Sequence, residues 1–214
     1  MNPVTRSAPI RPGAFDAIGG GASAPAGLLL AAGAGRRMGT PKALVDDWLA
    51  RGIDVLGAAG CTPIVVVLGA AAAQARALLQ GRTAIIATAH DWRAGLSASL
   101  RAGIAALPTS APAVVVMLVD LPDVGETVIR RVLQKGVAPT TLARATYHGW
   151  PGHPVVLGRA HWPGIIAAAH GDAGARVYFD RNAPALVECA DLASGRDIDY
   201  QGDAISSGGL ACVR

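Results

Sequence analysis

Short apolar runs of strand length alternate along this chain with longer alanine-rich stretches of helical length. Several of the runs are continuous stretches of Val, Ile and Leu, a pattern typical of parallel strands that are buried on both faces. The alternation predicts an α/β fold, a Rossmann-like three-layer α/β/α arrangement around a mostly parallel, doubly wound sheet. The predicted strands cover residues 27–31, 63–68, 83–88 and 113–118, and the helices between them cover 46–59, 70–80 and 96–106.

The second half of the chain is less regular, and we expect it to pack on the first sheet instead of folding alone. Its predicted elements are a helix at 126–134, strands at 142–147 and 154–157 around a turn at 148–152, helices at 159–169 and 173–181, and a strand at 185–189. Residues 1–25 are rich in proline and glycine, which predicts a flexible leader. A single domain is expected over residues 26–214, within the usual ~100–200 residues per domain.

Composition and charge exclude several classes of protein. Apolar residue types make up 51% of the chain and charged types 16%, which indicates a globular rather than a disordered protein. The net charge of +4 is spread without a long basic run, so we expect no nucleic-acid partner. No apolar run reaches the ~18 residues of a membrane-spanning helix, so we expect no membrane partner. The three cysteines lack a CxxC spacing, which argues against a disulfide scaffold or zinc site and favours a reducing, cytoplasmic location.

The loop that follows the first predicted strand is the most informative segment. Residues 30–42 read L-A-A-G-A-G-R-R-M-G-T-P-K. Small residues let backbone N–H groups approach phosphate oxygens, and cations neutralise those oxygens. A Rossmann dinucleotide loop needs G-x-G-x-x-G, but the spacing here is G-x-G-x-x-x-G, and a Walker A loop needs Ser or Thr after its lysine, but Ala follows Lys42. The loop fits instead the pattern L-A-A-G-x-S/G-x-R-M-G-x-x-K, without a gap.

This pattern resembles the signature of MobA-like nucleotidyltransferases, most closely that of the molybdenum cofactor cytidylyltransferase branch. Further segments agree with the family in order and spacing: W-R-A-G-L-S-A-S-L-R-A-G at 92–103, D-L-P at 120–122, G-H-P-V-V-L at 152–157 and G-D-A-G-A-R at 171–176. The resemblance covers residues 27 to about 203 and implies the nucleotidyltransferase form of the Rossmann-like fold. Three departures are visible: Ala89 stands where the family usually has Asn, the tail after Asp197-Ile198-Asp199 lacks Thr-Pro-Glu, and the stretch from Lys42 to Cys61 is a few residues short.

The resemblance also implies roles for individual residues. Arg37 and Lys42 are expected to be catalytic, because they can neutralise the triphosphate and the charge that develops at the α-phosphoryl group. Arg36 matches a variable position of the pattern and is interpreted as a solvated neighbour. The nucleotide-binding candidates are Leu30, Ala31, Ala32, Gly33, Gly35, Gly69, Gly95, Ser97 and Ser99. The metal-binding candidates are Asp120, Asp197 and Asp199, with Mg²⁺ as the expected cofactor, and the acceptor-binding candidates are Gly152, His153 and Asp172.

Several of these residues also have a purely structural interpretation. Lys42 could be a surface lysine, and Asp120 could cap the helix expected after it. The two serines could likewise cap the helix that they begin, and His153 could be a turn residue. The two aspartates of the tail could form a polar turn. These alternatives stay open at the level of the sequence.

The resemblance implies a Mg²⁺-dependent transfer of CMP from CTP, or of GMP from GTP, to the phosphate of a molybdopterin-type cofactor, with release of pyrophosphate. Molybdoenzymes that receive the product would be further partners. Three alternatives remain. They are transfer to another phosphorylated acceptor such as phospholactate, a non-catalytic nucleotide-binding module in molybdoenzyme maturation, and a Rossmann dehydrogenase, which the glycine spacing disfavours.

Overall fold

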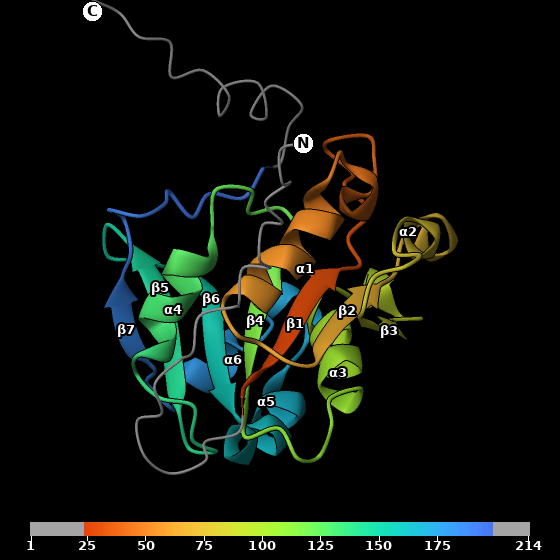
Figure 1. Cartoon of the computed structure of the whole chain (residues 1–214). Helices are drawn as coiled ribbons and strands as arrows, with labels where there is room; N and C mark the ends of the chain where they lie inside the picture. The colour runs from red at the N-terminus through yellow and green to blue at the C-terminus, as the bar shows by residue number, and fades with distance from the viewer. Residues whose placement is uncertain (1–23, 199–214) are drawn as a thin grey trace, which may run out of the picture.

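The computed structural model describes residues 24–198, which form one seven-stranded sheet with helices on both faces (Figure 1). The strands lie in the order β3-β2-β1-β4-β6-β5-β7. Their bounds are β1 Ala26–Ala31, β2 Ile64–Leu68, β3 Ile85–Thr88, β4 Ala113–Leu118, β5 Leu142–Tyr147, β6 Trp150–Gly158 and β7 Ala185–Glu188. The predicted α/β fold is confirmed and every predicted strand is present, although the strand expected at 154–157 already begins at Trp150.

The helices agree with the prediction in number and order between the first strands, but they are shorter. Their bounds are α1 Trp48–Ala58, α2 Ala72–Leu78, α3 Leu96–Ala105, α4 Glu126–Leu133, α5 Trp162–Ala168 and α6 Arg176–Phe179. Short 3-10 turns add η1 Lys42–Leu44, η2 Trp92–Ala94, η3 Arg159–His161 and η4 Gly171–Ala173. The stretch predicted as one helix at 159–169 is thus split into η3 and α5.

The sheet is parallel except for one strand. β1 pairs in parallel with β2 and β4, β2 with β3, and β5 with β7. β6 is antiparallel to both β4 and β5. The expectation that the second half does not fold alone is confirmed, and its strands extend the first sheet by hydrogen bonding as well as packing on it. β6 runs antiparallel to β5 because a tight turn joins the two strands. His148 and Gly149 form this turn, and both have the positive φ that such turns require.

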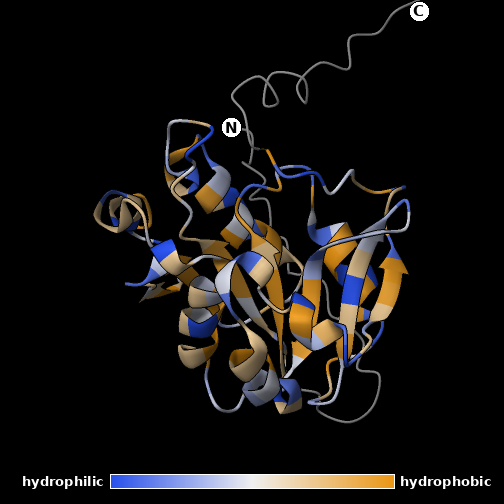
Figure 2. Cartoon of the chain, turned by 180° about the vertical axis from the view of Figure 1, so that it is seen from behind, coloured by the Kyte–Doolittle hydropathy of each residue, from blue (hydrophilic) through white to orange (hydrophobic). Residues whose placement is uncertain are grey.

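Alternate residues of the central strands enter two separate hydrophobic cores. Leu29 and Ala31 face the core that α1 and α4 cover, whereas Leu28 and Leu30 face the core that α3 and α5 cover. Hydrophobic residues accordingly gather on the central strands, between the two helical layers (Figure 2). Burial on both faces explains why these strands are continuous apolar runs in the sequence.

The order of the strands reverses next to β1. From β1 the chain passes outward to β2 and β3, and it then returns to β4 on the opposite side of β1. The loops that leave the carboxyl ends of β1 and β4 therefore diverge, and open α/β sheets bind their ligands in the crevice that this divergence creates. None of the helices within residues 24–198 is long and apolar enough to cross a membrane.

Candidate active site

A cavity of about 320 Å³ opens where the strand order reverses, between the loops after β1 and β4 and the start of α3. Its walls combine backbone from small residues with basic and acidic side chains. The lining residues are Leu30, Ala32, Gly33, Ala34, Arg36, Lys42, Trp92, Arg93, Gly95, Leu96, Ser99, Leu118, Val119, Asp120 and Asp172. The structure thus brings together predicted candidates from four separate segments of the chain.

The loop after β1 is held in one shape by its own backbone. Lys42 N donates a hydrogen bond to Gly33 O at 3.4 Å, so the loop closes on itself. Gly35 has a φ of +57°, and a Cβ at this position would lie 1.9 Å from Thr40 O. Only glycine fits there, because every other residue would collide with the returning backbone. This closure brings Lys42 back to the end of β1.

The cations of this loop gather beside the cavity. Gly35, Arg36, Arg37 and Lys42 line an adjoining pocket of about 160 Å³. Arg36, interpreted from the pattern as a solvated neighbour, lines both this pocket and the main cavity. Across the cavity, the guanidinium of Arg93 lies 4.5 Å from the ring centroid of Trp92, a cation–π distance. Three cations, Arg36, Lys42 and Arg93, thus line the cavity against two carboxylates, and this excess of positive charge suits an anionic ligand.

Lys42 and Asp120 form an ion pair through Lys42 Nζ and Asp120 Oδ2. Their side chains are 16% and 9% exposed, so the interpretation of Lys42 as a surface lysine is wrong. Burial raises the pKa of Asp120, and the ammonium of Lys42 opposes this rise. The alternative role of Asp120 as a helix cap is wrong as well, because Gly125 precedes α4 and no side chain caps that helix.

A second carboxylate lies near Asp120. Ile198 N donates a hydrogen bond to Asp120 O at 3.1 Å, which holds residues 197–198 beside the loop that follows β4. The charge of Asp197 is then close enough to raise the pKa of Asp120. Residues 24–198 contain no group of three or more His, Cys, Asp and Glu side chains that could hold a metal alone. Two carboxylates nevertheless suit a hard cation that takes its other ligands from water and phosphate. Asp199 lies outside the described residues.

The start of α3 forms the wall opposite the loop. Gly95 has a φ of +101°, and a Cβ there would lie 2.5 Å from Asp172 Oδ1. The same oxygen accepts a hydrogen bond from Leu96 N at 3.2 Å, so Asp172 satisfies one backbone donor at the helix N-terminus. Ser99 is buried and lines the cavity from the first turn of α3.

Four predicted nucleotide-binding residues do not line the main cavity: Gly35 lines the adjoining pocket, and Ser97, Gly69 and Ala31 lie behind the walls. Ser97 is fully buried, and its Oγ accepts a hydrogen bond from Gly174 N at 3.2 Å. Gly69 follows β2, and a Cβ there would lie 2.7 Å from the Cβ of Ala32. Ala31 is buried in the core beside α1. These residues fix the walls of the cavity from behind.

A second cavity of about 200 Å³ adjoins the first and extends towards β5 and β6. Three residues line both cavities: Leu30, Leu96 and Asp172. His153 lines the second cavity, where burial and the charge of Arg144 lower its pKa to about 4. Its imidazole is therefore neutral near neutral pH. Gly152 does not line the cavity, but its carbonyl accepts a hydrogen bond from Arg144 Nε at 3.0 Å.

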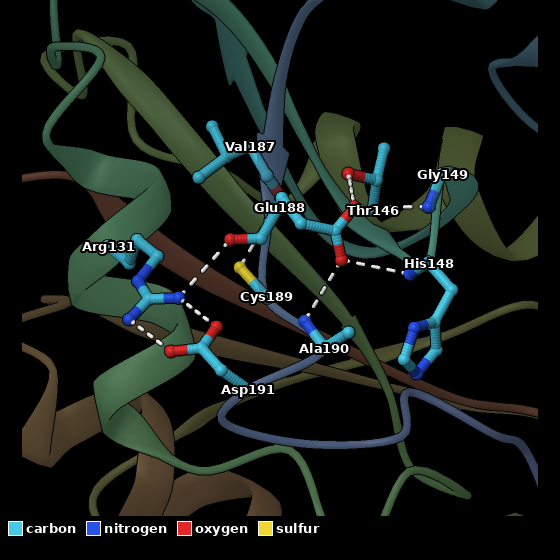
Figure 3. A network of polar contacts seen from close by, with 9 residues as sticks. All are labelled: Arg131, Thr146, His148, Gly149, Val187, Glu188, Cys189, Ala190 and Asp191. Atoms are coloured by element: carbon cyan, nitrogen blue, oxygen red, sulfur yellow. Dashed lines mark hydrogen bonds and ion pairs between the residues drawn. The ribbon is translucent and has the colours of Figure 1, made fainter.

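The carboxylate of Glu188 fixes the turn that leads into β6 (Figure 3). It accepts hydrogen bonds from Thr146 Oγ1 at 2.9 Å, His148 N at 2.9 Å, Gly149 N at 3.0 Å and Ala190 N at 3.0 Å. These bonds, that from Gly149 foremost, lower the pKa of Glu188 to about 2. The network ties β7 to the hairpin of β5 and β6, and so holds the strands that form one side of the second cavity.

Sequence reasoning missed four arginines that line the two cavities: Arg36, Arg93, Arg144 and Arg176. Arginine is so frequent in this chain that its presence at a given position carries little information. Arg176 ends the G-D-A-G-A-R segment, which could have marked it. No sequence motif marks Arg144 as a cavity residue. It lies beside the second cavity only because β5 pairs with β6.

Comparison with known proteins identifies the family. The profile of the MobA-like NTP transferase domain matches residues 27–186. Nicotine blue oxidoreductase from Paenarthrobacter nicotinovorans is 35% identical over 188 residues, which are 81% of this chain and 91% of that protein.

Solved structures share the fold. Rv0371c from Mycobacterium tuberculosis H37Rv has a TM-score of 0.72 at 27% identity, with 86% of this chain and 97% of that chain covered. A structure of the same protein in complex with manganese has a TM-score of 0.64 at 29% identity, with 78% and 88% covered. A nucleotidyl transferase from Methanothermobacter thermautotroptrophicus has a TM-score of 0.74 at 19% identity, with 87% and 96% covered, and bears on the fold alone. Because the profile spans most of the sheet and both cavities, the chain belongs to the family of MobA-like NTP transferase domains.

Proposed function

We propose that this protein transfers a nucleoside monophosphate from a nucleoside triphosphate to a phosphorylated acceptor and releases pyrophosphate. CMP is the nucleoside monophosphate that we expect. Membership of the family supports this class of reaction. The resemblance to the cytidylyltransferase branch supports CTP as donor and a molybdopterin-type cofactor as acceptor, with molybdoenzymes as later recipients. GMP transfer from GTP and transfer to phospholactate are the alternatives within the same class.

The grouping of Arg36, Lys42 and Asp120 in one cavity is the observation on which the proposal rests. A triphosphate is strongly anionic, so its binding site needs several preorganised cations and hydrogen-bond donors. The loop after β1 supplies two cations and a backbone of small residues, and the loop after β4 supplies a carboxylate for a divalent cation. Such a combination is unusual in a cavity that binds only neutral ligands.

In the proposed reaction, an oxygen of the acceptor phosphate attacks the α-phosphorus in line. A new P–O bond forms, the bond from the α-phosphorus to the bridging oxygen breaks, and its electron pair leaves with pyrophosphate. No covalent intermediate with the protein is needed, because the acceptor brings its own anionic nucleophile. Lys42, Arg36 and Arg37 neutralise the charge of the phosphates, and the rigid loop holds them in place.

We expect Mg²⁺ to take part, held by Asp120 and Asp197 and completed by water and phosphate oxygens. When bound, it would neutralise phosphate charge and help to orient the triphosphate. The complex of Rv0371C with manganese supports a divalent cation in a related structure. Lys42, which shares the carboxylate of Asp120, would then be available to the phosphates.

Calorimetric titration of CTP, GTP, ATP and UTP, each with and without Mg²⁺, tests the site. We expect one cytidine or guanosine triphosphate to bind best and to bind more tightly with Mg²⁺. In Asp120→Asn the dependence on Mg²⁺ should largely disappear, because a neutral amide is a poor ligand for a hard cation. Asp54→Asn, which changes an exposed carboxylate on α1, is the control and should behave like the wild type.

Pyrophosphate release with each phosphorylated acceptor tests the transfer itself. Turnover in Asp120→Asn should fall by about 10²-fold or more, because charge stabilisation is lost at the reacting phosphates. Wild-type binding that ignores Mg²⁺ would contradict the mechanism. Tight binding without turnover for any acceptor would favour the non-catalytic nucleotide-binding module instead.

A second candidate function comes from the name of one relative. Nicotine blue oxidoreductase is 35% identical, and its name states an oxidation–reduction reaction. The glycine spacing of the loop after β1 departs from that of a dinucleotide site, which counts against a nicotinamide cofactor here. Titration of NADH and NADPH, followed by their oxidation with a dye acceptor, separates the two. Binding of a reduced nicotinamide in preference to CTP and GTP would support the second candidate.

A further inference from the structure

Two arginines line the second cavity and lie outside the first cavity, where the triphosphate is proposed to bind. They are Arg144 on β5 and Arg176 at the start of α6. Burial lowers the pKa of Arg144, and the nearby charge of Arg176 lowers it further, which places the two guanidinium groups within electrostatic reach of each other. Two like charges held together store repulsion that an anion between or beside them would relieve.

Arg144 is held rigidly enough to act as a recognition group. Its Nε donates a hydrogen bond to Gly152 O at 3.0 Å, and its guanidinium lies 5.6 Å from the ring centroid of Phe179. Within residues 24–198, its terminal nitrogens have no hydrogen-bond acceptor and Arg176 forms no ion pair. A guanidinium fixed through Nε and a ring contact still presents its two terminal nitrogens, the geometry that binds phosphate oxygens in pairs.

Acidic side chains close to the pair do not neutralise it. Asp172 lines the same cavity, but its Oδ1 accepts a hydrogen bond from Leu96 N at the start of α3. Asp180 lies with the two arginines on the outer surface, where a wider hollow of about 570 Å³ also includes Trp150. Neither carboxylate forms an ion pair with Arg144 or Arg176 within the described part of the chain. The positive charge of the pair is therefore available to a ligand.

The remaining walls suit an apolar body. Leu100, Val155, Leu157 and Phe179 supply apolar surface, and His153 supplies a neutral ring with one donor and one acceptor. A cavity of about 200 Å³ is below the usual ~300–1,000 Å³ of a ligand site, so it holds a headgroup and not a second nucleotide. The shared residues Leu30, Leu96 and Asp172 place this headgroup next to the first cavity.

We propose that Arg144 and Arg176 form the anion-recognition subsite for the second substrate, a phosphate monoester attached to a small, partly apolar group. The identification of this ligand as the acceptor rests on the proposed function. The subsite also explains the geometry of the two cavities, because a transfer between two anionic substrates needs separate cations for each of them. Arg144 and Arg176 are binding residues in this scheme, and Lys42 and Arg36 serve the triphosphate.

Phenyl phosphate is the probe, and saturation-transfer NMR measures its binding. The protein is first saturated with Mg²⁺ and an α,β-methylene analogue of the best-bound triphosphate, so that the first cavity is filled. Phenyl phosphate should still bind, whereas phenol, benzoate and inorganic phosphate should each bind more weakly. In Arg176→Gln, an exposed position, the dissociation constant should rise about tenfold or more, because a charge-assisted hydrogen bond is lost.

Two further variants complete the test. Arg181→Gln removes an exposed arginine of the same region and should leave binding unchanged. Arg144→Lys keeps the charge but loses the paired nitrogens, and it should weaken phenyl phosphate binding while thermal unfolding shows a folded protein. Triphosphate affinity should stay within about twofold of wild type in all three variants, because additive behaviour is expected for a separate subsite.

Other outcomes overturn the proposal. Phenyl phosphate that binds Arg176→Gln as tightly as the wild type, or that the nucleotide analogue displaces, would show that the arginine pair is not a separate subsite. Equal binding of phenol would show an apolar site, and equal binding of inorganic phosphate would show a general anion site. A wild type that binds neither CTP nor GTP would instead overturn the proposed function, while the dependence of phenyl phosphate binding on Arg176 would still be measured.

Discussion

Removal of the Lys42 side chain should destabilise the protein as well as inactivate it. Lys42 pairs with Asp120, whose residue exposure is only 6%. In Lys42→Ala the carboxylate stays buried but loses its cation. A buried polar group that loses its partner costs about 1–3 kcal/mol, and a charged one can cost more. We therefore expect the free energy of unfolding to fall by at least about 1–3 kcal/mol near neutral pH.

The loss should depend on pH, and the structure gives its sign. The folded-state pKa of Asp120 lies above its ordinary value of 3.8 because burial outweighs the opposing effect of Lys42. The folded protein thus binds a proton that the unfolded chain releases, so stability falls as the pH rises through the interval between the two pKa values. Without Lys42 the folded pKa rises further, and each added unit removes about 1.4 kcal/mol at high pH. Below the ordinary pKa the variant and the wild type should converge.

Urea unfolding of both proteins across this pH range measures the effect. Asp120→Asn introduced into Lys42→Ala removes the unpaired charge and should recover much of the lost stability at neutral pH. The reasoning is refuted if Lys42→Ala matches the wild type at neutral pH, or if its loss is the same at every pH and the second substitution does not relieve it. Activity should stay low in both variants, since both lack a cation for the phosphates.

Three further outcomes are expected. Gly35→Ala should destabilise the protein by about 1–3 kcal/mol and weaken triphosphate binding, because its Cβ would lie 1.9 Å from Thr40 O at a φ of +57°; thermal unfolding and calorimetry measure both. Glu188 contributes stability that is complete above its ordinary pKa of 4.5 and is lost as the pH falls towards about 2, so Glu188→Gln should flatten the acid limb of a melting-temperature profile. Ser97→Ala should cost about 1–3 kcal/mol by leaving Gly174 N without its acceptor, yet triphosphate affinity should not change, which calorimetry can check.

The central strands could be predicted because their signal is local. β1, β2 and β4 are continuous apolar runs, and burial on both faces requires such runs. The antiparallel place of β6 could not be predicted with the same certainty, since it depends on a tight turn and on pairing with β4 about forty residues earlier in the chain. The two positive φ values at His148 and Gly149 are a property of the folded hairpin, and histidine is not a typical residue for the first of them.

Several residues that line the main cavity could be predicted from the sequence, but their contacts could not. The loop pattern and the end of an apolar run marked Lys42 and Asp120, yet nothing in the sequence joins two residues that lie 78 positions apart. Ser97 shows the opposite case, because a serine at a helix start looks like a ligand or a cap, and only the fold shows that it faces Gly174. Contacts of this kind depend on how α3 and η4 pack, which the local pattern does not contain.

The ion pair of Lys42 and Asp120 gives the site a coupling that neither residue has alone. The ammonium of Lys42 and a divalent cation are both attracted to the same carboxylate, so in the proposed function they compete for it. Asp120 and the nearby Asp197 would hold the divalent cation, whose higher charge two carboxylates favour, and Lys42 would then be available to the phosphates. In the proposed function, the ion pair would balance the buried charge of Asp120 in the absence of a divalent cation. This reasoning explains why Asp120→Asn is expected to lose the dependence on Mg²⁺ while Lys42→Ala is expected to lose stability.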